Sequence, residues 1–370
     1  MSRISIDPEL DGGNPPHRTD LLRREAAPLA EPCPNKRVAG HQARQINKQL
    51  LLDSRAYACE RPLTSWWALL STLGLFVGLQ AVAAVDGFPL FVRLAASIIA
   101  GLTIVRLFIL YHDHQHGTIL KKSRLVRAFM LLYGLLTLNP PSIWKRSHDH
   151  HHRHNSKLMG ASIGSFPVMT VSRYRTATRG ERLAYAATRH PLTFLFAYGT
   201  VFLYGMCIRS LIVNPRLHID SGLAILTHFG VAVVLGLAGW DLLLLCLVLP
   251  SAIAATAGAY LFYAQHNFPG TRFFESAARW DYVSAALNSS SYMPMGPVLA
   301  WFTGNIGYHH VHHVNHHIPF YRLPEAMAGM PALHNPKSTS LSLRDIRACL
   351  GLKLWDEERQ EMVPWPGGLW

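Results

Sequence analysis

The apolar residues of this chain gather into long blocks and do not alternate with polar residues over short distances. Three of the blocks reach about 20 residues, the length that a helix needs to cross the hydrocarbon core of a bilayer. They are Ser65–Val85, Pro89–Leu110 and Asp241–Tyr263, and a shorter block, Leu223–Leu237, precedes the last of them. The pattern predicts an all-α integral membrane protein with about four transmembrane helices.

Two further apolar segments are predicted to lie in the membrane interface without crossing it. Leu192–Val213 carries Arg209 in its interior, and Arg127–Leu138 is too short to cross. The four crossing helices then pair into two hairpins, with turns at Asp86–Phe88 and Leu237–Asp241. In this arrangement both turns lie on one side of the membrane, and all other segments outside the membrane lie on the opposite side.

The distribution of charge indicates which side this is. Lys and Arg number 35 against 22 Asp and Glu, although charged residues make up only 15% of the chain. Basic residues concentrate between positions 121 and 189, outside the predicted turns, so the positive-inside rule places this region in the cytoplasm. We attribute the basic excess to topology and to contact with lipid phosphates, and we expect no nucleic-acid partner.

The chain is predicted to have three parts. Residues 1–60 form a polar, partly disordered cytoplasmic extension that lacks the apolar stretch of a signal peptide. Residues 61–336 form the membrane domain, and residues 337–370 form a cytoplasmic C-terminal segment. The five cysteines are widely spaced and form no CxxC pair, so we expect neither a disulfide framework nor a zinc–thiolate site.

Histidine is the residue that carries candidate chemistry. Of the 21 histidines, 14 lie in Tyr111–Thr118, Ser147–Asn155 and Gly304–Tyr321. Residues at i, i+3 and i+4 share one face of a helix, and each stretch contains such a set. Eight imidazoles therefore converge: His112, His116, His148, His151, His152, His309, His312 and His313. We expect them to lie in a cytoplasmic, histidine-rich helical cap.

The remaining histidines are given structural interpretations. Six of them diverge from the shared faces and are expected to be solvated or hydrogen-bonded: His114, His150, His154, His310, His316 and His317. Six more are isolated along the chain: His17, His41, His190, His218, His228 and His334.

Eight convergent imidazoles suit a pair of metal ions. Neutral imidazole binds iron, zinc, copper and nickel, and a single zinc takes only about four ligands. Two metals with about four nitrogens each would leave room for an exogenous ligand. Asp113 and Asp149 each follow a candidate ligand, and we expect these carboxylates to orient the ligating histidines through hydrogen bonds. One HxxxH pair alone would more often be a surface pair.

The three stretches together resemble the membrane fatty acid desaturase family, in particular its bacterial acyl-lipid branch. "HDHQH" resembles the first histidine box, "HDHHH" the second, and "NIGYHHVHHVNHHIPFYRLP" the third with its sequel. The resemblance runs from about Trp66 to Pro336, and it implies a ninth ligand, His266 in "YAQHNFPG". The surplus histidines His316 and His317 depart from the pattern and leave the register of the third box open.

The resemblance also implies the chemistry. Two iron ions would reduce O2 with two external electrons, and two hydrogens would be removed from an acyl chain to form a double bond. The implied substrate is a membrane acyl lipid in preference to an acyl-CoA. Because no cytochrome b5 or ferredoxin motif is visible, we expect a separate electron donor such as ferredoxin. Candidate docking residues are Lys121, Lys122, Arg124, Arg173 and Arg175.

Two other functions remain open at this point. A related membrane hydroxylase or ketolase, for example one acting on carotenoids, shares the form of the first box. A non-enzymatic metal-binding or transport protein would place its polar ligands near the membrane midplane. The apolar centres of the three long blocks contain no histidine, which counts against transport.

Overall fold

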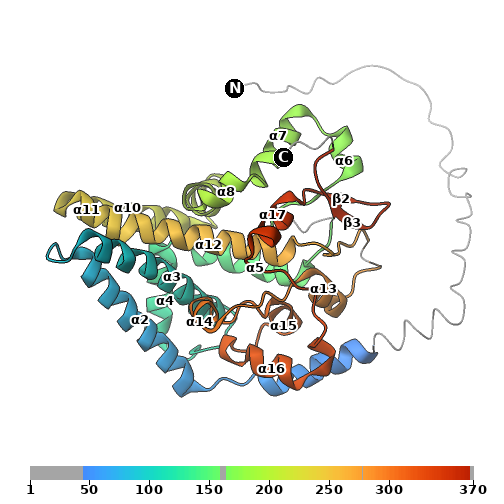
Figure 1. The fold of residues 1–370 in the computed structure, drawn as a ribbon, viewed down its shortest axis with the longest axis horizontal. Coiled ribbons are helices and arrows are strands. Elements are labelled where there is room, and N and C mark those ends of the chain that lie inside the picture. Colours follow the sequence, from blue (N-terminus) through green and yellow to red (C-terminus); the bar gives the residue numbers. More distant parts are fainter. Residues whose placement is uncertain (1–44, 159–163, 277, 367–370) are drawn as a thin grey trace, which may run out of the picture. The chain divides into compact units, whose positions relative to one another are not determined.

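The computed structural model describes residues 45–158, 164–276 and 278–366. The chain divides into two units, Met1–Ile46 and Asn47–Trp370, and the elements labelled in Figure 1 belong to the second. Residues 1–44, including His17 and His41 of the predicted extension, lie outside the described part. Residues 47–54 are helical, and Leu50 is buried in the core, so the packed unit begins well before residue 60.

Four helices are long and apolar enough to cross a membrane, which confirms the predicted all-α membrane fold. They are α2 (Pro62–Ala84), α3 (Leu90–Gln115), α10 (Ile219–Ala238) and a continuous helix from Trp240 to His266. The last of these consists of α11 (Trp240–Leu243), the π-helical η3 (Leu244–Val248) and α12 (Leu249–His266). Each corresponds to one of the apolar blocks of the sequence.

The turns of the two hairpins lie at the same end of the helices. Arg93, near the start of α3, pairs with Asp86 in the first turn at 2.8 Å and also with Asp241 just beyond the second turn. From that end α3 and α12 run side by side (Figure 1), and Gly101 packs directly against Ile253. The histidine-bearing ends of both helices therefore lie opposite the turns.

The segment Leu192–Val213, which we predicted to lie in the membrane interface, is interrupted. It contains α8 (Pro191–Leu195), the π-helical η2 (Tyr198–Ile208) and α9 (Arg209–Val213). The continuous part from Tyr198 to Val213 would span only about 24 Å at 1.5 Å per residue, less than the roughly 30 Å of the hydrocarbon core. The second predicted interfacial segment is α4 (Arg124–Leu136), which exposes Leu125, Leu131 and Leu132 and buries its opposite face.

Short helices connect and cover the ends of the long ones. They are η1 (Arg55–Tyr57), α5 (Pro141–His154), α6 (Val171–Thr176), α7 (Arg179–Thr188), α13 (Tyr282–Ser289), α14 (Pro297–Phe302), α15 (His309–Val314), η4 (Phe320–Arg322), α16 (Leu323–Gly329), η5 (Pro331–Leu333) and α17 (Leu343–Gly351). Several of these helices begin with residues that are typical of helix N-termini. Proline occupies the first position of α5, α8 and α14, where its missing N–H costs nothing. Thr178 and Glu181 form a capping box at α7.

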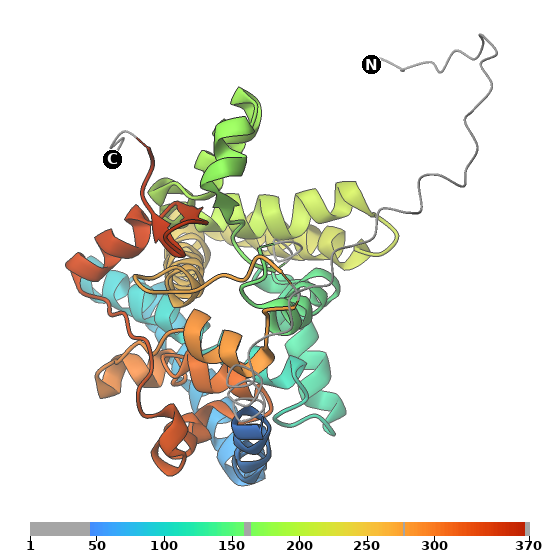
Figure 2. The same ribbon diagram turned by 90° about the vertical axis from the view of Figure 1, so that its right-hand side faces the viewer.

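The C-terminal segment packs onto this unit through a small sheet. β1 (Met169–Thr170) pairs in parallel with β2 (Leu354–Asp356), and β2 pairs antiparallel with β3 (Glu361–Val363). Trp355 on β2 is almost fully buried, and Cys349 on α17 is fully buried. Figure 2 shows the sheet and α17, in red, against the body of the molecule. The four described cysteines are free thiols.

The paired turns predict the topology of the chain in the membrane. Reporters fused after Thr118, after Lys157 and after Pro336 should all report the cytoplasmic side, whereas a reporter after Gly239 should report the opposite side. A reporter after Arg216 should also be cytoplasmic, because the continuous helical part of Leu192–Val213 is too short to cross. An opposite-side signal after Arg216 would contradict this arrangement.

Candidate metal centre

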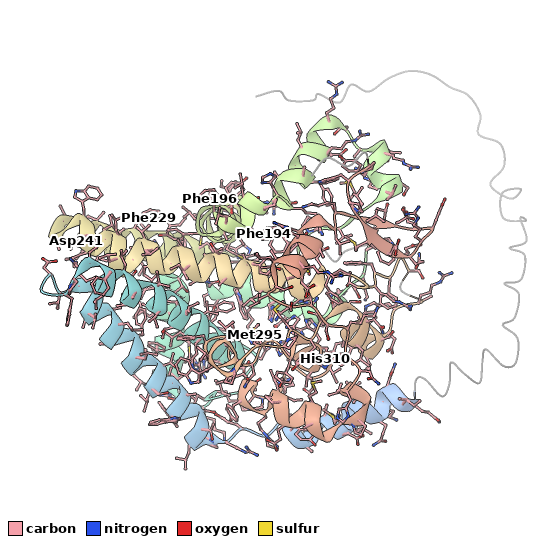
Figure 3. The ribbon with its side chains drawn as sticks, viewed as in Figure 1. Phe194, Phe196, Phe229, Asp241, Met295 and His310 are labelled. Carbon is pink, nitrogen blue, oxygen red and sulfur yellow. The ribbon has the colours of Figure 1, made fainter. Side chains whose placement is uncertain are left out.

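Four separate segments carry the nine histidines that we predicted as ligands. His112 lies in the last turn of α3 and His116 immediately follows that helix, whereas His266 is the last residue of α12. The other six lie on two short helices: His148, His151 and His152 on α5, and His309, His312 and His313 on α15. Figure 3 shows the side chains of this region and labels His310, a neighbour of these ligands on α15.

The structure brings these nine histidines into two groups. One group contains five buried histidines, namely His112, His116, His148, His152 and His312, whose candidate ligand atoms lie within 4.8 Å of one another. Within it, Nε2 of His148 lies 2.9 Å from Nε2 of His112 and 3.1 Å from that of His152. Nε2 of His312 lies 3.0 Å from Nε2 of His152. Each box therefore contributes to the first group.

The second group contains His151, His266, His309 and His313. Nε2 of His266 lies 3.0 Å from Nε2 of His151 and 2.8 Å from Nε2 of His309. Nε2 of His313 lies 3.1 Å from that of His309 and 3.2 Å from that of His151. The second and third boxes thus divide their histidines between the groups, because i and i+4 point to one side of each helix and i+3 to the other.

Hydrogen bonds at the far side of the rings determine which nitrogen faces the group. Nδ1 of His266 donates to the backbone oxygen of Ser289 at 2.9 Å, so its Nε2 carries a lone pair toward the other imidazoles. Nδ1 of His112 bonds to Oδ1 of Asp113 at 3.0 Å, and Oδ2 of Asp113 accepts from the backbone N–H of Phe320 at 2.8 Å. Asp113 therefore orients His112 and ties the first box to the segment that follows the third.

Burial keeps the imidazoles of the two cap helices neutral. The pKa values of His148, His151, His152, His309, His312 and His313 all lie well below the ordinary value of 6.5. Loss of hydration is the main cause, and the neighbouring imidazoles act in the same direction. Neutral imidazole is the form that binds metals.

The spacing and the chemistry of the donor atoms fit a metal in each group. An ion about 2.0–2.1 Å from imidazole nitrogens separates neighbouring nitrogens by about 2.9–3.4 Å for tetrahedral or octahedral angles. The observed separations are 2.8–3.2 Å. Lone pairs that face one another at this distance in a dry interior repel, and a shared cation removes that repulsion.

Asp149 does not occupy the position that its sequence context suggested. We expected it to orient a ligand, as Asp113 does, but its carboxylate pairs with Lys145 one turn earlier on α5 at 2.9 Å. The side chain is partly exposed. It lies on the side of α5 that faces away from the groups, because one residue rotates a helix by about 100°.

The isolated histidines that the structure describes make hydrogen bonds outside the two groups. His228 on α10 bonds to the backbone oxygen of Leu136 at 2.6 Å, and His218 bonds to Ser142 at 2.8 Å. His190 caps α8, and His334 approaches the backbone oxygen of Ala328 at 3.2 Å. These contacts agree with the structural interpretation.

The divergent histidines have different environments. His310 is fully buried, its ring packs near Tyr292, and it interacts with the backbone of Leu333. His316 lies beside the five-histidine group, and its Nδ1 is buried without a hydrogen-bond partner in the described part of the chain. By contrast, His114 bonds to the backbone oxygen of Ile119, and His154 bonds to that of His150.

A close approach between α3 and the third box allows the boxes to meet. Gly304 has a positive φ of 51°, and a Cβ there would lie 2.7 Å from Cγ2 of Ile109 on α3. Arg106 on α3 donates to the backbone oxygen of Trp301 and lies over its ring, 4.0 Å from the centroid. The chain between α14 and α15 is thus fixed against the helix that carries the first box.

Buried imidazole clusters at the ends of membrane-spanning helices define a membrane protein with a histidine-rich candidate metal centre. The model of the fatty acid desaturase family matches residues 87–337, which include all three boxes and His266, and the chain belongs to this family. A fatty acid desaturase of Bacillus subtilis (strain 168) is 32% identical over 332 residues, covering 89% of this chain and 92% of the relative. An sn-1 oleoyl-lipid 12-desaturase of Picosynechococcus is 26% identical over 139 residues, or 37% of each chain.

Replacing a convergent histidine should remove metal, whereas replacing a divergent one should not. We expect His152→Ala and His309→Ala each to lose metal, measured per chain by elemental analysis of the purified protein, because each variant removes a nitrogen from a different group. His154→Ala is the matched control and should retain the parent content. Metal loss in His154→Ala with retention in His152→Ala would contradict the assignment of the helix faces.

The two aspartates that follow the first histidines of their boxes should behave differently. Asp113→Ala should weaken metal binding about 10- to 100-fold, the usual effect of removing a group that orients a ligand. Asp149→Ala should leave metal affinity unchanged, because its carboxylate pairs with Lys145. Competition with a chelator measures both affinities. Equal effects of the two substitutions would contradict the orienting role of Asp113.

Proposed function

We propose that this protein is an O2-dependent acyl-lipid desaturase whose two histidine groups hold a di-iron centre. The observation that carries the proposal is the division of nine imidazoles into two adjacent groups of five and four in a member of the fatty acid desaturase family. The overall reaction would convert O2, two electrons, two protons and a saturated acyl segment into an alkene and two molecules of water.

The division of labour follows from the substrate. An unactivated methylene offers no group for acid or base catalysis, so the cofactor supplies the oxidising chemistry when it is bound. The residues of the chain orient the ligating imidazoles and exclude water from the site. Asp113 and the backbone oxygen of Ser289 hold the rings of His112 and His266, and burial keeps the nitrogens unprotonated.

A cavity next to the four-histidine group supports an apolar substrate. His266 lies in its wall together with Phe166, Phe262 and Phe273. Its lining also includes Arg189 and the hydroxyl side chains of Ser156, Ser165 and Ser289, so both apolar and polar residues line the cavity. This combination suits a lipid chain that carries an oxygenated head, and the Picosynechococcus relative is described as acting on an oleoyl lipid.

The location of the groups favours catalysis over transport. His112 and His266 lie at the ends of their helices, opposite the turns held by Arg93, and not at mid-height. A transporter would place its ligands near the midplane. We assign the histidine-bearing side to the cytoplasm because the basic residues lie there.

Expression in a host that lacks desaturases tests the function. Mass spectrometry of membrane lipids should show acyl chains that have lost two hydrogens, and His152→Ala should abolish this product while His154→Ala retains it. Oxygenated carotenoids in the pigment extract, without new unsaturation, would instead assign a hydroxylase or ketolase. Absence of both products, with metal bound, would contradict an enzymatic role.

The electron donor is proposed to be a separate acidic carrier that docks at Lys121, Lys122 and Arg124. These three residues are exposed and begin five residues after His116 of the five-histidine group. Arg173, also considered from the sequence, pairs with Glu181 at 2.5 Å, which reduces its availability to a partner. Opposite charge accelerates encounter, and salt screens this effect with a Debye length of about 8 Å at physiological ionic strength.

Reversing Lys121 and Lys122 to Glu should slow donor-dependent turnover and flatten its dependence on salt, while metal content stays unchanged. The matched control reverses Arg344 and Arg347, two exposed residues of α17. Figure 2 shows α17 on the opposite side of the molecule from α4. Equal slowing in both variants, or a flat salt profile in the parent protein, would exclude docking at this site.

A further inference from the structure

His316 lies against the five-histidine group, although it belongs to none of the three box patterns. It follows α15 by two residues, in the turn after the third box. Its ring centroid lies 4.7 Å from that of His116 and 5.0 Å from that of His152. These two neighbours come from the first and second boxes, so His316 closes the space between α3 and α5.

The turn that carries His316 is held by hydrogen bonds and by one ring contact. The backbone oxygen of His316 accepts from Oγ1 of Thr118 at 3.1 Å. The ring also packs on His317, with centroids 4.4 Å apart. Asn315 accepts from the backbone N–H of His317 at 3.0 Å and donates to Ser54 at 2.9 Å. The position of the ring is therefore built into the fold.

Each of the two rings, His316 and His116, carries a buried nitrogen without a protein partner among the described residues. Nδ1 of His316 is buried and makes no hydrogen bond among the described residues, and the same is true of Nε2 of His116. A buried polar atom without a partner costs about 1–3 kcal/mol, so its retention calls for an explanation. A bound cation between these rings would satisfy both nitrogens.

We propose that His316 is a sixth nitrogen ligand for the metal of the five-histidine group. This role rests on the proposed di-iron function. Five imidazoles leave one position of an octahedron open, and four leave two. With His316 in the last position of the five-histidine group, exogenous ligands would reach the centre at the four-histidine group. His266, a member of that group, lines a cavity.

Two substitutions separate a ligand from a packing residue. His316→Ala removes both the ring and its nitrogens, whereas His316→Phe keeps an aromatic ring between His116 and His152 and removes only the nitrogens. His317→Ala, in the same turn but exposed, is the matched control. The readout is the rate at which iron passes from the purified protein to a ferrous chelator, which needs no turnover.

The parent protein should hold two irons per chain. In His316→Ala and His316→Phe, one iron should leave about tenfold faster than in the parent, and the other iron should leave at the parent rate. Tenfold is the low end of the 10- to 100-fold effect of losing a group that supports a metal site. Free imidazole should slow the fast phase in His316→Ala, where it has space to bind, and not in His316→Phe. His317→Ala should release iron as the parent does.

Three outcomes would overturn the proposal. Parent-like release in both His316 variants would show that the side chain does not bind metal. Fast release in His316→Ala with parent-like release in His316→Phe would assign a packing role. A parent protein that binds fewer than two irons would overturn the di-iron function together with this role, and so is distinguishable from the first two.

Discussion

The contact between imidazole nitrogens from four different segments is the constraint on which the rest of this structure depends. Nε2 atoms of α3, α5, α12 and α15 approach one another to about 3 Å in an interior with little water. Charged imidazoles could not be packed in this way, because their repulsion would be large at low dielectric. The arrangement therefore requires neutral rings and hydrogen bonds that fix their orientation, and a cation bound within each group would remove the remaining repulsion between the lone pairs.

The membrane helices α3 and α12 meet this requirement because their packing fixes the positions of their histidine-bearing ends. Arg93 joins both hairpin turns at one end, so α3 and α12 deliver His112 and His266 together at the other. The close approach at Gly304 then brings the third box onto α3. The proposed acyl-lipid substrate would reach such a centre directly from the bilayer, and the cavity next to His266 lies at this end of α12.

The two histidine groups are unequal, and this inequality bears on how the centre would work. The five-histidine group has an additional imidazole, His316, against it, whereas the four-histidine group borders a cavity with an apolar wall. A centre with one closed and one accessible side would direct small molecules and substrate to the same place. The regular spacing of histidines along three helices does not create this difference between the groups. The difference arises from the turn after α15, which carries His316, and from the end of α12, which carries His266.

Apolar length and the i, i+3, i+4 rule are local properties, so the membrane helices and the eight convergent imidazoles could be predicted from the sequence. It did not separate Asp113 from Asp149, since both stand in the same "HDH" context. Only the packing of Phe320 onto α3 makes one of them an orienting group, while Lys145 engages the other. Only the family resemblance implied His266 as a ligand, and His316 lies outside the pattern of the three boxes. Their placement depends on distances between helices far apart in the chain, and only tertiary structure decides these.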